Sequence, residues 1–364
     1  MPKRHDSLFG QIATFQALRA GARKAIRGKR KKPGASAFQF GLERELLRLE
    51  RELQDGTYKP GRYIEIELKS PKKRLVSAAP FRDRVVHHAL VNVVGPIFEH
   101  GFIGNTFANR IGKGSHKAIE KFEYYRDRHA HVLRCDIYRY FPSIDHAIIK
   151  NDLRRRLSCE RTLWLLDTII DGSNPQEPVH LHFPGDDLLS PLERRRGLPI
   201  GNLTSQFLAN LYLDPLDHFC TEVLVAPYVR YVDDFALFHD DPGVLSEWRK
   251  RVDRFLQGRR LKNHPRKSFV AATSAPAEFL GFVLHEGGKR ALDDGNVRRF
   301  KGRLRGMLAA VRAGTLSRGD AKMRIDAWAA HADHAHARGM KRAILGRAAK
   351  ALRSGPERSF ARTA

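Results

Sequence analysis

Two adjacent aspartates between two apolar, strand-like segments constrain this chain more than any other feature. Tyr228–Val232 precedes the pair and Phe235–Phe238 follows it, so the sequence predicts a β-hairpin with Asp233 and Asp234 in its two-residue turn. Favoured hairpin turns end in Gly, which supplies positive φ, and neighbouring carboxylates repel each other. A divalent cation that neutralises the pair would explain it. A solvated acidic turn is the simpler alternative.

A third aspartate, Asp136, ends another apolar strand, predicted over His131–Ile137, and a new element begins near Phe141. A carboxylate in that setting is costly to bury unless it is paired or binds a metal. A capping or turn role is the alternative. Three carboxylates at neighbouring strand ends suit two-metal phosphoryl transfer, in which one ion activates a 3′ hydroxyl and the other stabilises the leaving pyrophosphate.

The charge of the chain points to a polyanionic partner. Its 364 residues include 66 Lys and Arg against 40 Asp and Glu, a formal net charge of +26. A field of this size attracts nucleic acid, although a merely basic, solvated surface remains the alternative. The hydrophobic content of 42% argues against global disorder, and the length allows two or three subdomains.

Cysteine usage and hydropathy indicate the cellular compartment of the protein. Its three cysteines include no CxxC pair, which argues against a disulfide scaffold and a structural zinc site. The first ten residues lack a signal-peptide core, and no apolar run reaches the length of a membrane span. We therefore expect a cytoplasmic protein without membrane contact.

Periodicity predicts a mixed α/β body followed by basic helices. A helix is expected over Phe38–Gln54 and another over Asp83–Phe98, with a hairpin of Tyr63–Leu68 and Leu75–Ala78 between them. A strand is expected over Phe279–Leu284. A loop is expected over 172–196, and the segment beyond about residue 288 is expected to form helices with a basic face. The histidine groups at 87–88, 180–182 and 331–336 are interpreted as surface or nucleic-acid contacts rather than metal ligands, and the tryptophan at 328 as packing.

The carboxylate motifs resemble those of the reverse transcriptase family, and they occur in the family's order. Asp136–Phe141 is similar to the first catalytic motif, and Tyr231–Asp234 is similar to the Y-x-D-D motif. The resemblance implies an α/β (α+β) right-hand polymerase with fingers, palm and helical thumb. It further implies a basic N-terminal extension at 1–35, fingers at 36–130, palm at 131–287, and a basic helical thumb and tail at 288–364.

The resemblance also implies the catalytic and metal-binding residues. Asp136 and Asp233 would be the principal catalytic ligands of two Mg²⁺ ions, for which Mn²⁺ can substitute, and Asp234 would be secondary. Ile137, next to Asp136, is included in the metal site. Lys267 is similar to the lysine that protonates pyrophosphate in this family.

Further positions are implied to contact the substrate. Phe141 is similar to the steric gate that excludes a ribose 2′-hydroxyl, with a core aromatic as the alternative. Lys72 and Arg74 fall on the fingers hairpin that holds the incoming dNTP, and the neighbouring Lys69 and Lys73 can share that task. The segment Phe279–Phe282 resembles the primer grip.

One departure narrows the resemblance. Group II intron enzymes carry Pro-Gln-Gly where this chain has Pro199-Ile200-Gly201, and the following pattern includes Gln206. This resembles diversity-generating retroelement enzymes, which copy a template-repeat RNA with errors at adenine, and it implies that Ile200 and Gln206 contact the substrate. Template RNA, an RNA–DNA duplex and a small basic oligomeric accessory protein are the implied partners. No room is expected for RNase H, integrase or endonuclease domains.

Two other functions stay open at this stage. A group II-like or defence-associated bacterial reverse transcriptase is one alternative. The other is an RNA-binding splicing helper with a vestigial site, against which the three intact aspartates count.

Overall fold

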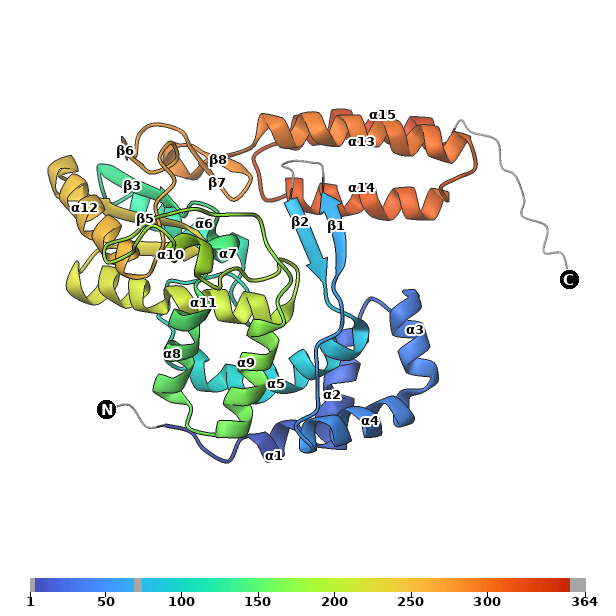
Figure 1. Ribbon diagram of the computed structural model, residues 1–364. Coiled ribbons are helices and arrows are strands. Elements are labelled where there is room, and N and C mark those ends of the chain that lie inside the picture. Colours follow the sequence, from blue (N-terminus) through green and yellow to red (C-terminus); the bar gives the residue numbers. More distant parts are fainter. Residues whose placement is uncertain (1–3, 69–73, 354–364) are drawn as a thin grey trace, which may run out of the picture.

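The computed structural model describes residues 4–68 and 74–353. Its centre is a four-stranded antiparallel sheet with strand order β4-β5-β3-β6 (Figure 1). The strands are β3 (His131–Asp136), β4 (Tyr228–Tyr231), β5 (Asp234–His239) and β6 (Phe269–Ala272). The three strands predicted in this region, at 131–137, 228–232 and 235–238, are confirmed to within a residue or two at their ends, and so is the mixed α and β character of the chain.

The two faces of this sheet meet different helices. Leu133 and Cys135 of β3 belong to the main core, together with Val252 of α12 (Pro242–Gly258). Val132 instead joins a second core with Phe122 of α6 (Ser115–Arg126). Because side chains alternate along a strand, Arg134 and Asp136 share the α6 face with Val132. Because Leu133 and Cys135 are buried in the main core, Arg134 and Asp136 must project from the opposite face of the sheet.

An N-terminal group of helices packs against the sheet-bearing body through α5 (Phe81–Glu99) (Figure 1). The other helices of this group are α1 (Phe9–Ile12), α2 (Phe15–Ile26), α3 (Pro33–Phe40) and α4 (Leu42–Gln54). At the crossing of α2 and α5, a Cβ at Gly21 would lie 2.5 Å from the Val85 carbonyl oxygen, so the close approach requires glycine. The helix expected over 38–54 is wrong as a single element, because it is interrupted at Gly41.

The predicted hairpin between α4 and α5 is present. Strands β1 (Ile64–Leu68) and β2 (Arg74–Ala78) pair antiparallel, with Leu68 opposite Arg74. The hairpin stands between the N-terminal helices and the C-terminal helical layer (Figure 1).

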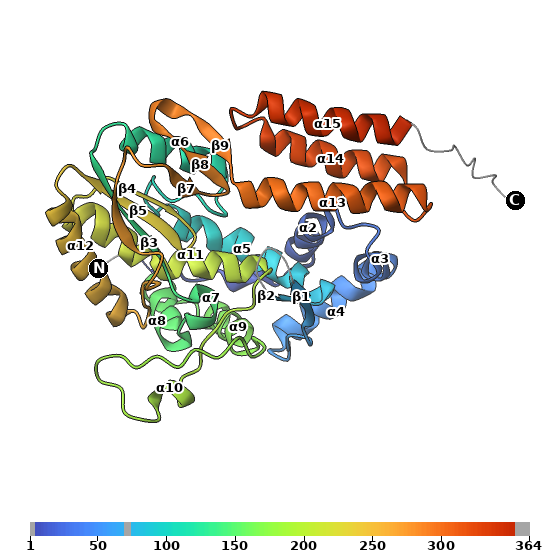
Figure 2. The ribbon, with the colours of Figure 1, turned by 90° about the horizontal axis from the view of Figure 1, so that it is seen from above.

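A long, mostly irregular segment follows the second of two longer helices that come after β3. The helices are α8 (His146–Arg156) and α9 (Glu160–Asp171), and the segment continues to α11 (Leu203–His218), with the short α10 (Ser190–Glu193) inside it. This agrees with the loop expected at 172–196, which protrudes from the body (Figure 2). Its base is held by Arg194, which forms ion pairs with Asp186 and Asp145. After α11 the chain continues through a π-helical turn, Phe219–Val223, into β4.

The C-terminal part consists of a small sheet and a layer of three helices (Figure 2). The strands are β7 (Ala277–Phe279), β8 (Phe282–Leu284) and β9 (Arg290–Leu292), and the helices are α13 (Asp294–Arg312), α14 (Arg318–Ala332) and α15 (Arg338–Arg353). The single strand expected over Phe279–Leu284 is wrong, because Leu280 and Gly281 have φ of 49° and 86° and turn the chain between β7 and β8. Trp328 stacks on Phe300 with ring centroids 3.9 Å apart, as a packing residue would.

Two expectations about buried groups have different outcomes. Cys135, Cys159 and Cys220 are buried free cysteines, which agrees with the expected absence of a disulfide scaffold. His87 is buried in α5 with 1% exposure, so its interpretation as a surface histidine is wrong. None of the helices in the described part of the chain combines the length and the apolar composition needed to cross a bilayer.

Candidate functional site

The candidate site lies where β3 ends and β5 begins. Asp136 is the last residue of β3 and pairs directly with Asp234, the first residue of β5. Residues directly opposite in an antiparallel pair have Cβ atoms roughly 4.5–5.5 Å apart and project to the same face. The two carboxylates are therefore neighbours on the α6 face, and both remain partly exposed.

The turn between β4 and β5 differs from the sequence prediction by one residue. Val232 and Asp233 form it, because Asp234 is already paired with Tyr231. Val232 has φ of 58°, a left-handed conformation that a β-branched residue rarely adopts. The turn therefore holds backbone strain beside Asp233, which is common at functional sites.

Main-chain hydrogen bonds tie the turn to the end of β3. The Ile137 N–H donates to the Asp233 carbonyl at 3.2 Å. The Ile137 side chain is 1% exposed and belongs to the main core. Its side chain has no ligand atom, so only its main-chain oxygen can take part in a metal site.

Burial and mutual repulsion raise the pKa values of two of the carboxyls. Burial, and then the negative charge of Asp136, raise the pKa of Asp233. Burial raises the pKa of Asp234 to about 7, with Asp233 and Asp136 adding to the rise and Arg134 and Lys267 opposing it. Carboxylates that repel each other in this way are the ligands that hard divalent cations prefer, so the donor chemistry fits Mg²⁺.

The side chains are not arranged as a complete metal-binding group. Across residues 4–68 and 74–353, no three or more His, Cys, Asp or Glu side chains come together as metal ligands would. Lys267 Nζ donates to Asp136 Oδ1 at 2.8 Å and to Oδ2 at 2.7 Å. A cation bound by Asp136 would compete with that ammonium for the carboxylate.

Pairing of β3 with β6 brings Lys267 to Asp136. The Asp136 carbonyl accepts from the His264 N–H at 2.6 Å, and its N–H donates to Ser268 Oγ at 3.3 Å. These bonds fasten the loop that precedes β6 to the end of β3. The structure thus brings together four predicted site residues: Asp136, Asp233, Asp234 and Lys267.

Phe141 and Ile200 lie on segments that are hydrogen-bonded to each other. Phe141 is in the short helix α7 (Tyr140–Ser143), half-buried against the main core. Its carbonyl accepts from the Leu198 N–H at 3.0 Å. Two residues later, the Ile200 carbonyl accepts from the Ser77 N–H of β2 at 3.0 Å.

Asn202 completes this connection, and sequence reasoning gave it no role. It is 4% exposed. Its Nδ2 donates to the Ser77 carbonyl at 2.7 Å, and its Oδ1 accepts from the Ala79 N–H at 3.0 Å. The neighbouring Gly201 has φ of 109°, and a Cβ there would lie 2.9 Å from Val76 Cγ1. These contacts attach the segment around Ile200 to the β1–β2 hairpin. The position of Asn202 directly before a helix was the feature of the sequence that could have indicated a structural role.

Among the residues that the structure describes, the remaining ones predicted to contact the substrate form no hydrogen bond or ion pair with the carboxylates. Arg74 is the first residue of β2. Its positive charge opposes the rise in the pKa of Asp233, so this end of the hairpin acts electrostatically on the site. Lys72, with Lys69 and Lys73, lies outside the described residues. Gln206 is half-buried in the first turn of α11, where its N–H donates to the Asn202 carbonyl at 3.2 Å.

Two arginines near the site were also missed. Arg134, on β3, places its guanidinium 4.0 Å from Asp234 Oδ1, and the alternation along β3 was the signal for it. Arg230, on β4, is buried with Asp217 behind the turn. A single arginine within an apolar strand was the sequence feature that could have indicated a buried ion pair.

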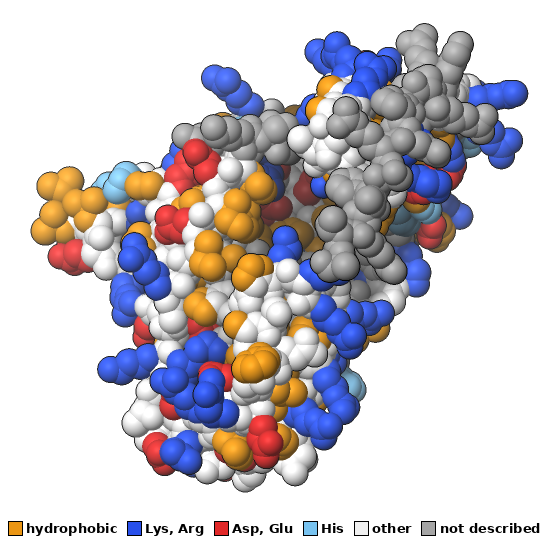
Figure 3. Space-filling view, turned by 90° about the vertical axis from the view of Figure 1, so that its right-hand side faces the viewer, with side chains coloured by type: hydrophobic (Ala, Val, Ile, Leu, Met, Phe, Trp, Pro, Cys, Tyr) orange, Lys and Arg blue, Asp and Glu red, His pale blue; other side chains and the backbone are white. Residues whose placement is uncertain are grey.

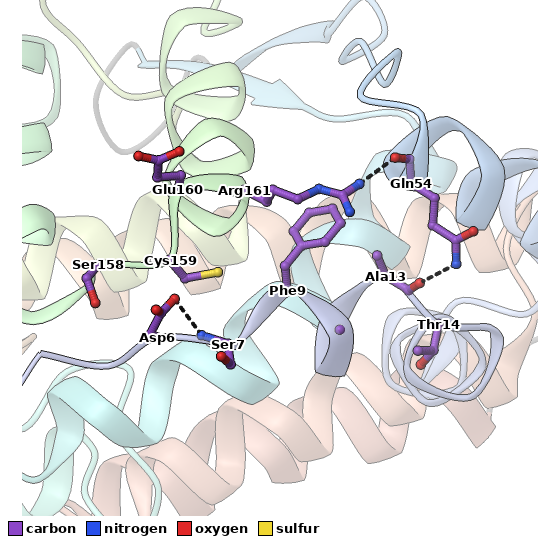
Figure 4. Close-up of a pocket in the computed structure, with 11 residues that line it drawn as sticks. Asp6, Ser7, Phe9, Ala13, Thr14, Gln54, Ser158, Cys159, Glu160 and Arg161 are labelled. Atoms are coloured by element: carbon purple, nitrogen blue, oxygen red, sulfur yellow. Dashed lines mark hydrogen bonds between the residues drawn. The ribbon is translucent and has the colours of Figure 1, made fainter.

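A separate pocket of about 770 Å³ lies between the N-terminal segment and the start of α9 (Figure 4). Arg161 crosses it, with its guanidinium 4.1 Å from the centroid of the Phe9 ring and a hydrogen bond to the Gln54 carbonyl. Cys159 also lines the pocket. None of the predicted site residues does, so this pocket is distinct from the carboxylate site.

Comparison with known proteins finds a matching family model and two relatives. A family model described as reverse transcriptase (RNA-dependent DNA polymerase) matches residues 59–284. Protein YkfC of Escherichia coli is 27% identical over 192 residues, covering 51% of this chain and 48% of the relative. An uncharacterized 91 kDa protein in cob intron of Schizosaccharomyces pombe is 26% identical over 166 residues, covering 46% of this chain and 19% of the relative. The chain thus spans about half of the first relative and about a fifth of the second.

Proposed function

The chain belongs to the reverse transcriptase family, and from that premise we propose that it is an RNA-directed DNA polymerase. The observation that carries the proposal is the direct pairing of Asp136 with Asp234 across β3 and β5. Asp233 occupies the turn beside them. Carboxylates gathered on one sheet face can hold the metal ions that phosphoryl transfer uses. Without a cation, their partial burial costs free energy of folding.

In the proposed reaction, Asp136 and Asp233 are the principal ligands of two Mg²⁺ ions, and Asp234 assists. When bound, such ions lower the pKa of the attacking 3′ hydroxyl and offset the charge of the leaving pyrophosphate. A cation at Asp136 would compete with the Lys267 ammonium and favour its release. The freed ammonium then lies beside the reacting groups and can donate a proton to the pyrophosphate.

The substrate contacts follow from the neighbouring segments. Arg74, with Lys72, is proposed to hold the triphosphate, since guanidinium and ammonium groups clamp phosphate well. Phe141 is proposed to pack against the 2′ position of the incoming sugar. Ile200 and Gln206 are proposed to lie beneath the nascent base pair, on the segment that is clamped to β2.

We assign fingers to 36–130, palm to 131–287 and thumb to 288–364, preceded by a basic extension at 1–35. The net charge of +26 supports binding of template RNA and an RNA–DNA duplex over a wide surface. Lys and Arg side chains are spread from the helical layer to the base of the molecule (Figure 3). RNA affinity should fall about a hundredfold or more between about 50 and 200 mM salt, as released counterions require. A flat salt response would contradict this binding mode.

For the biological role we propose a diversity-generating retroelement, in which a template-repeat RNA is copied with errors at adenine. Ile200 in place of a glutamine supports this role, because an apolar side chain cannot hydrogen-bond to the nascent pair. A small basic oligomeric accessory protein is the proposed partner. An intron-type reverse transcriptase is the second candidate, and the match to a protein in the cob intron favours it.

Primer extension on an RNA template with Mg²⁺ or Mn²⁺ tests the proposed activity. The wild-type chain should extend the primer, while Asp136→Asn and Asp233→Asn should each slow it about a thousandfold or more, since each loses a carboxylate that binds the ions. Glu247→Gln, an exposed change on α12, is the matched control and should leave the rate unchanged. Wild-type-like rates in both Asp variants would show that other carboxylates carry the reaction. A wild-type chain that binds RNA but extends no primer would favour a splicing helper.

A further inference from the structure

A fully buried ion pair lies behind the turn that carries Asp233. Arg230 of β4 and Asp217 of α11 have side chains that are 1% and 0% exposed. Arg230 Nε donates to Asp217 Oδ1 at 2.6 Å, and Nη2 donates to Oδ2 at 2.5 Å. The Tyr228 hydroxyl also donates to Asp217 Oδ1, at 2.8 Å. The carboxylate is thus held by three donors, which fix the guanidinium plane.

The remaining guanidinium nitrogen of Arg230 reaches the turn itself. Nη1 donates to the Val232 carbonyl at 2.9 Å. Val232 is the residue at φ 58°, and its carbonyl belongs to the peptide group that leads into Asp233. Holding that oxygen fixes the rotation of the peptide plane, and with it the direction in which the Asp233 side chain leaves the backbone.

Arg230 acts from the face of the sheet opposite the carboxylates. Tyr228, two residues before it on β4, belongs to the main core, whereas Val229 belongs to the core on the α6 face. Alternation therefore places Arg230 on the side away from Asp136. It cannot touch a substrate on the carboxylate face, so any effect on the reaction must pass through the turn.

Stability alone does not account for this arrangement. Buried ion pairs are weak evidence for stability, because apolar side chains of similar volume often replace them without loss. A strained conformation such as that of Val232 persists only when its surroundings over-determine it. The bond to the Val232 carbonyl supplies such a constraint, and an apolar replacement could not.

We propose that Arg230 is a positioning residue for phosphoryl transfer, which holds Asp233 in its cation-binding orientation through the Val232 carbonyl while Asp217 fixes the guanidinium. This inference rests on the proposed polymerase function. It makes the reaction rate depend on Arg230 in addition to the three carboxylates.

The test replaces the buried polar group by apolar side chains. The triple variant Arg230→Met, Asp217→Leu, Tyr228→Phe removes both charges and the Tyr228 hydroxyl together, so no lone charge is left buried. Asn210 Oδ1, which accepts from Arg230 Nη1 at 3.4 Å, loses that donor. The matched control is Arg259→Met, Asp152→Leu, which removes another bidentate pair, largely buried at 12% and 6% exposure, whose arginine donates to a main-chain carbonyl, that of Tyr212. Thermal unfolding, RNA–primer affinity and single-turnover extension are measured for both variants and for the wild-type chain.

We expect the triple variant to fold and to bind RNA–primer like the control, but to extend at least tenfold more slowly at saturating dNTP and to need more Mn²⁺ for half-maximal rate. A triple variant as fast as the control would overturn the proposal. If it does not fold, Arg230→Lys is tested instead, since one ammonium cannot serve Asp217 and Val232 as the guanidinium fork does. A wild-type rate in Arg230→Lys would likewise overturn it.

Val232→Gly separates positioning from packing. Glycine adopts positive φ without strain, so adding this change to the slowed variant should recover part of the rate. No recovery would assign Arg230 to packing and overturn the proposal. An inactive wild-type chain would instead refute the proposed function, so the two failures are distinguishable.

Discussion

Lys267 holds both carboxylate oxygens of Asp136, with its Nζ 2.8 Å from Oδ1 and 2.7 Å from Oδ2. The pair is partly exposed, at 42% for Lys267 and 22% for Asp136, so water screens it and the ammonium can leave. In the proposed reaction, the same lysine competes with a cation for Asp136 and then serves as a proton donor.

Replacing Lys267 should separate these two roles. Lys267→Met should bind Mn²⁺ severalfold more tightly, about 1 kcal/mol after screening. It should also extend primers about a hundredfold more slowly, because a general acid is lost. Mn²⁺ titration by electron paramagnetic resonance and single-turnover kinetics measure the two effects. Lys262→Met, an exposed neighbour, should change neither; weaker Mn²⁺ binding in Lys267→Met would contradict the competition.

Divalent-cation binding should strengthen as pH rises from 6 to 8. The pKa of Asp234 is raised to about 7, so below pH 7 a cation must displace a proton from this carboxyl. The pKa of Asp233 is raised in the same direction. Affinity should rise by up to about tenfold for each pH unit below 7 and level off above it. Calorimetry in buffers of different ionisation enthalpy should detect the released protons, and Asp234→Asn should flatten the slope. The same affinity at pH 6 and pH 8 would show that Asp234 is already ionised at pH 6.

Phe141→Ala should admit ribonucleotides. Removing the ring opens space where we propose that the 2′ carbon of the incoming sugar lies, so the preference for dNTP over rNTP should fall, by about tenfold or more for a contact worth 1–3 kcal/mol. Competition between the two nucleotides on one RNA template measures it. Phe15→Ala, which removes a partly buried ring from the same core, is the control. An unchanged preference would return Phe141 to a packing role.

Ile200→Gln should lower misincorporation opposite adenine. An apolar surface discriminates between pairs by about 1–3 kcal/mol, whereas a glutamine can hydrogen-bond to a correctly formed pair. Sequencing cDNA made by both enzymes from one adenine-rich template tests this, with the other template bases as the internal control. Equal adenine error rates would remove Ile200 from the mechanism, and few errors in the wild type would count against the retroelement role.

Acid should destabilise the protein through His87. Burial lowers the pKa of His87 to about 3, below its unfolded value, so the unfolded chain takes up the proton first and stability falls as pH drops from about 6.5 toward 3. This one group should cost about 2 kcal/mol between pH 7 and pH 5. His87→Met should remove that part of the pH dependence in denaturant unfolding, while His180→Gln, at an exposed site, should not. The same pH slope in His87→Met and wild type would refute the assignment.

The sequence by itself determined the chemistry of the candidate site. Asp136, Asp233 and Asp234 are recognisable because each follows or precedes an apolar strand, and strand alternation and a local turn are short-range properties. The same local pattern was enough to predict β3, β4, β5 and the β1–β2 hairpin.

Only the tertiary structure decided how these residues meet. Pairing of β3 with β5 sets the register that moves the turn to Val232 and Asp233, and pairing of β3 with β6 brings Lys267 to Asp136. The clamp of Asn202 on β2 and the bond from Arg230 to the turn depend in the same way on contacts between distant segments. Such contacts leave no periodic signature in the sequence, because their partners are set by packing of whole elements rather than by neighbouring residues.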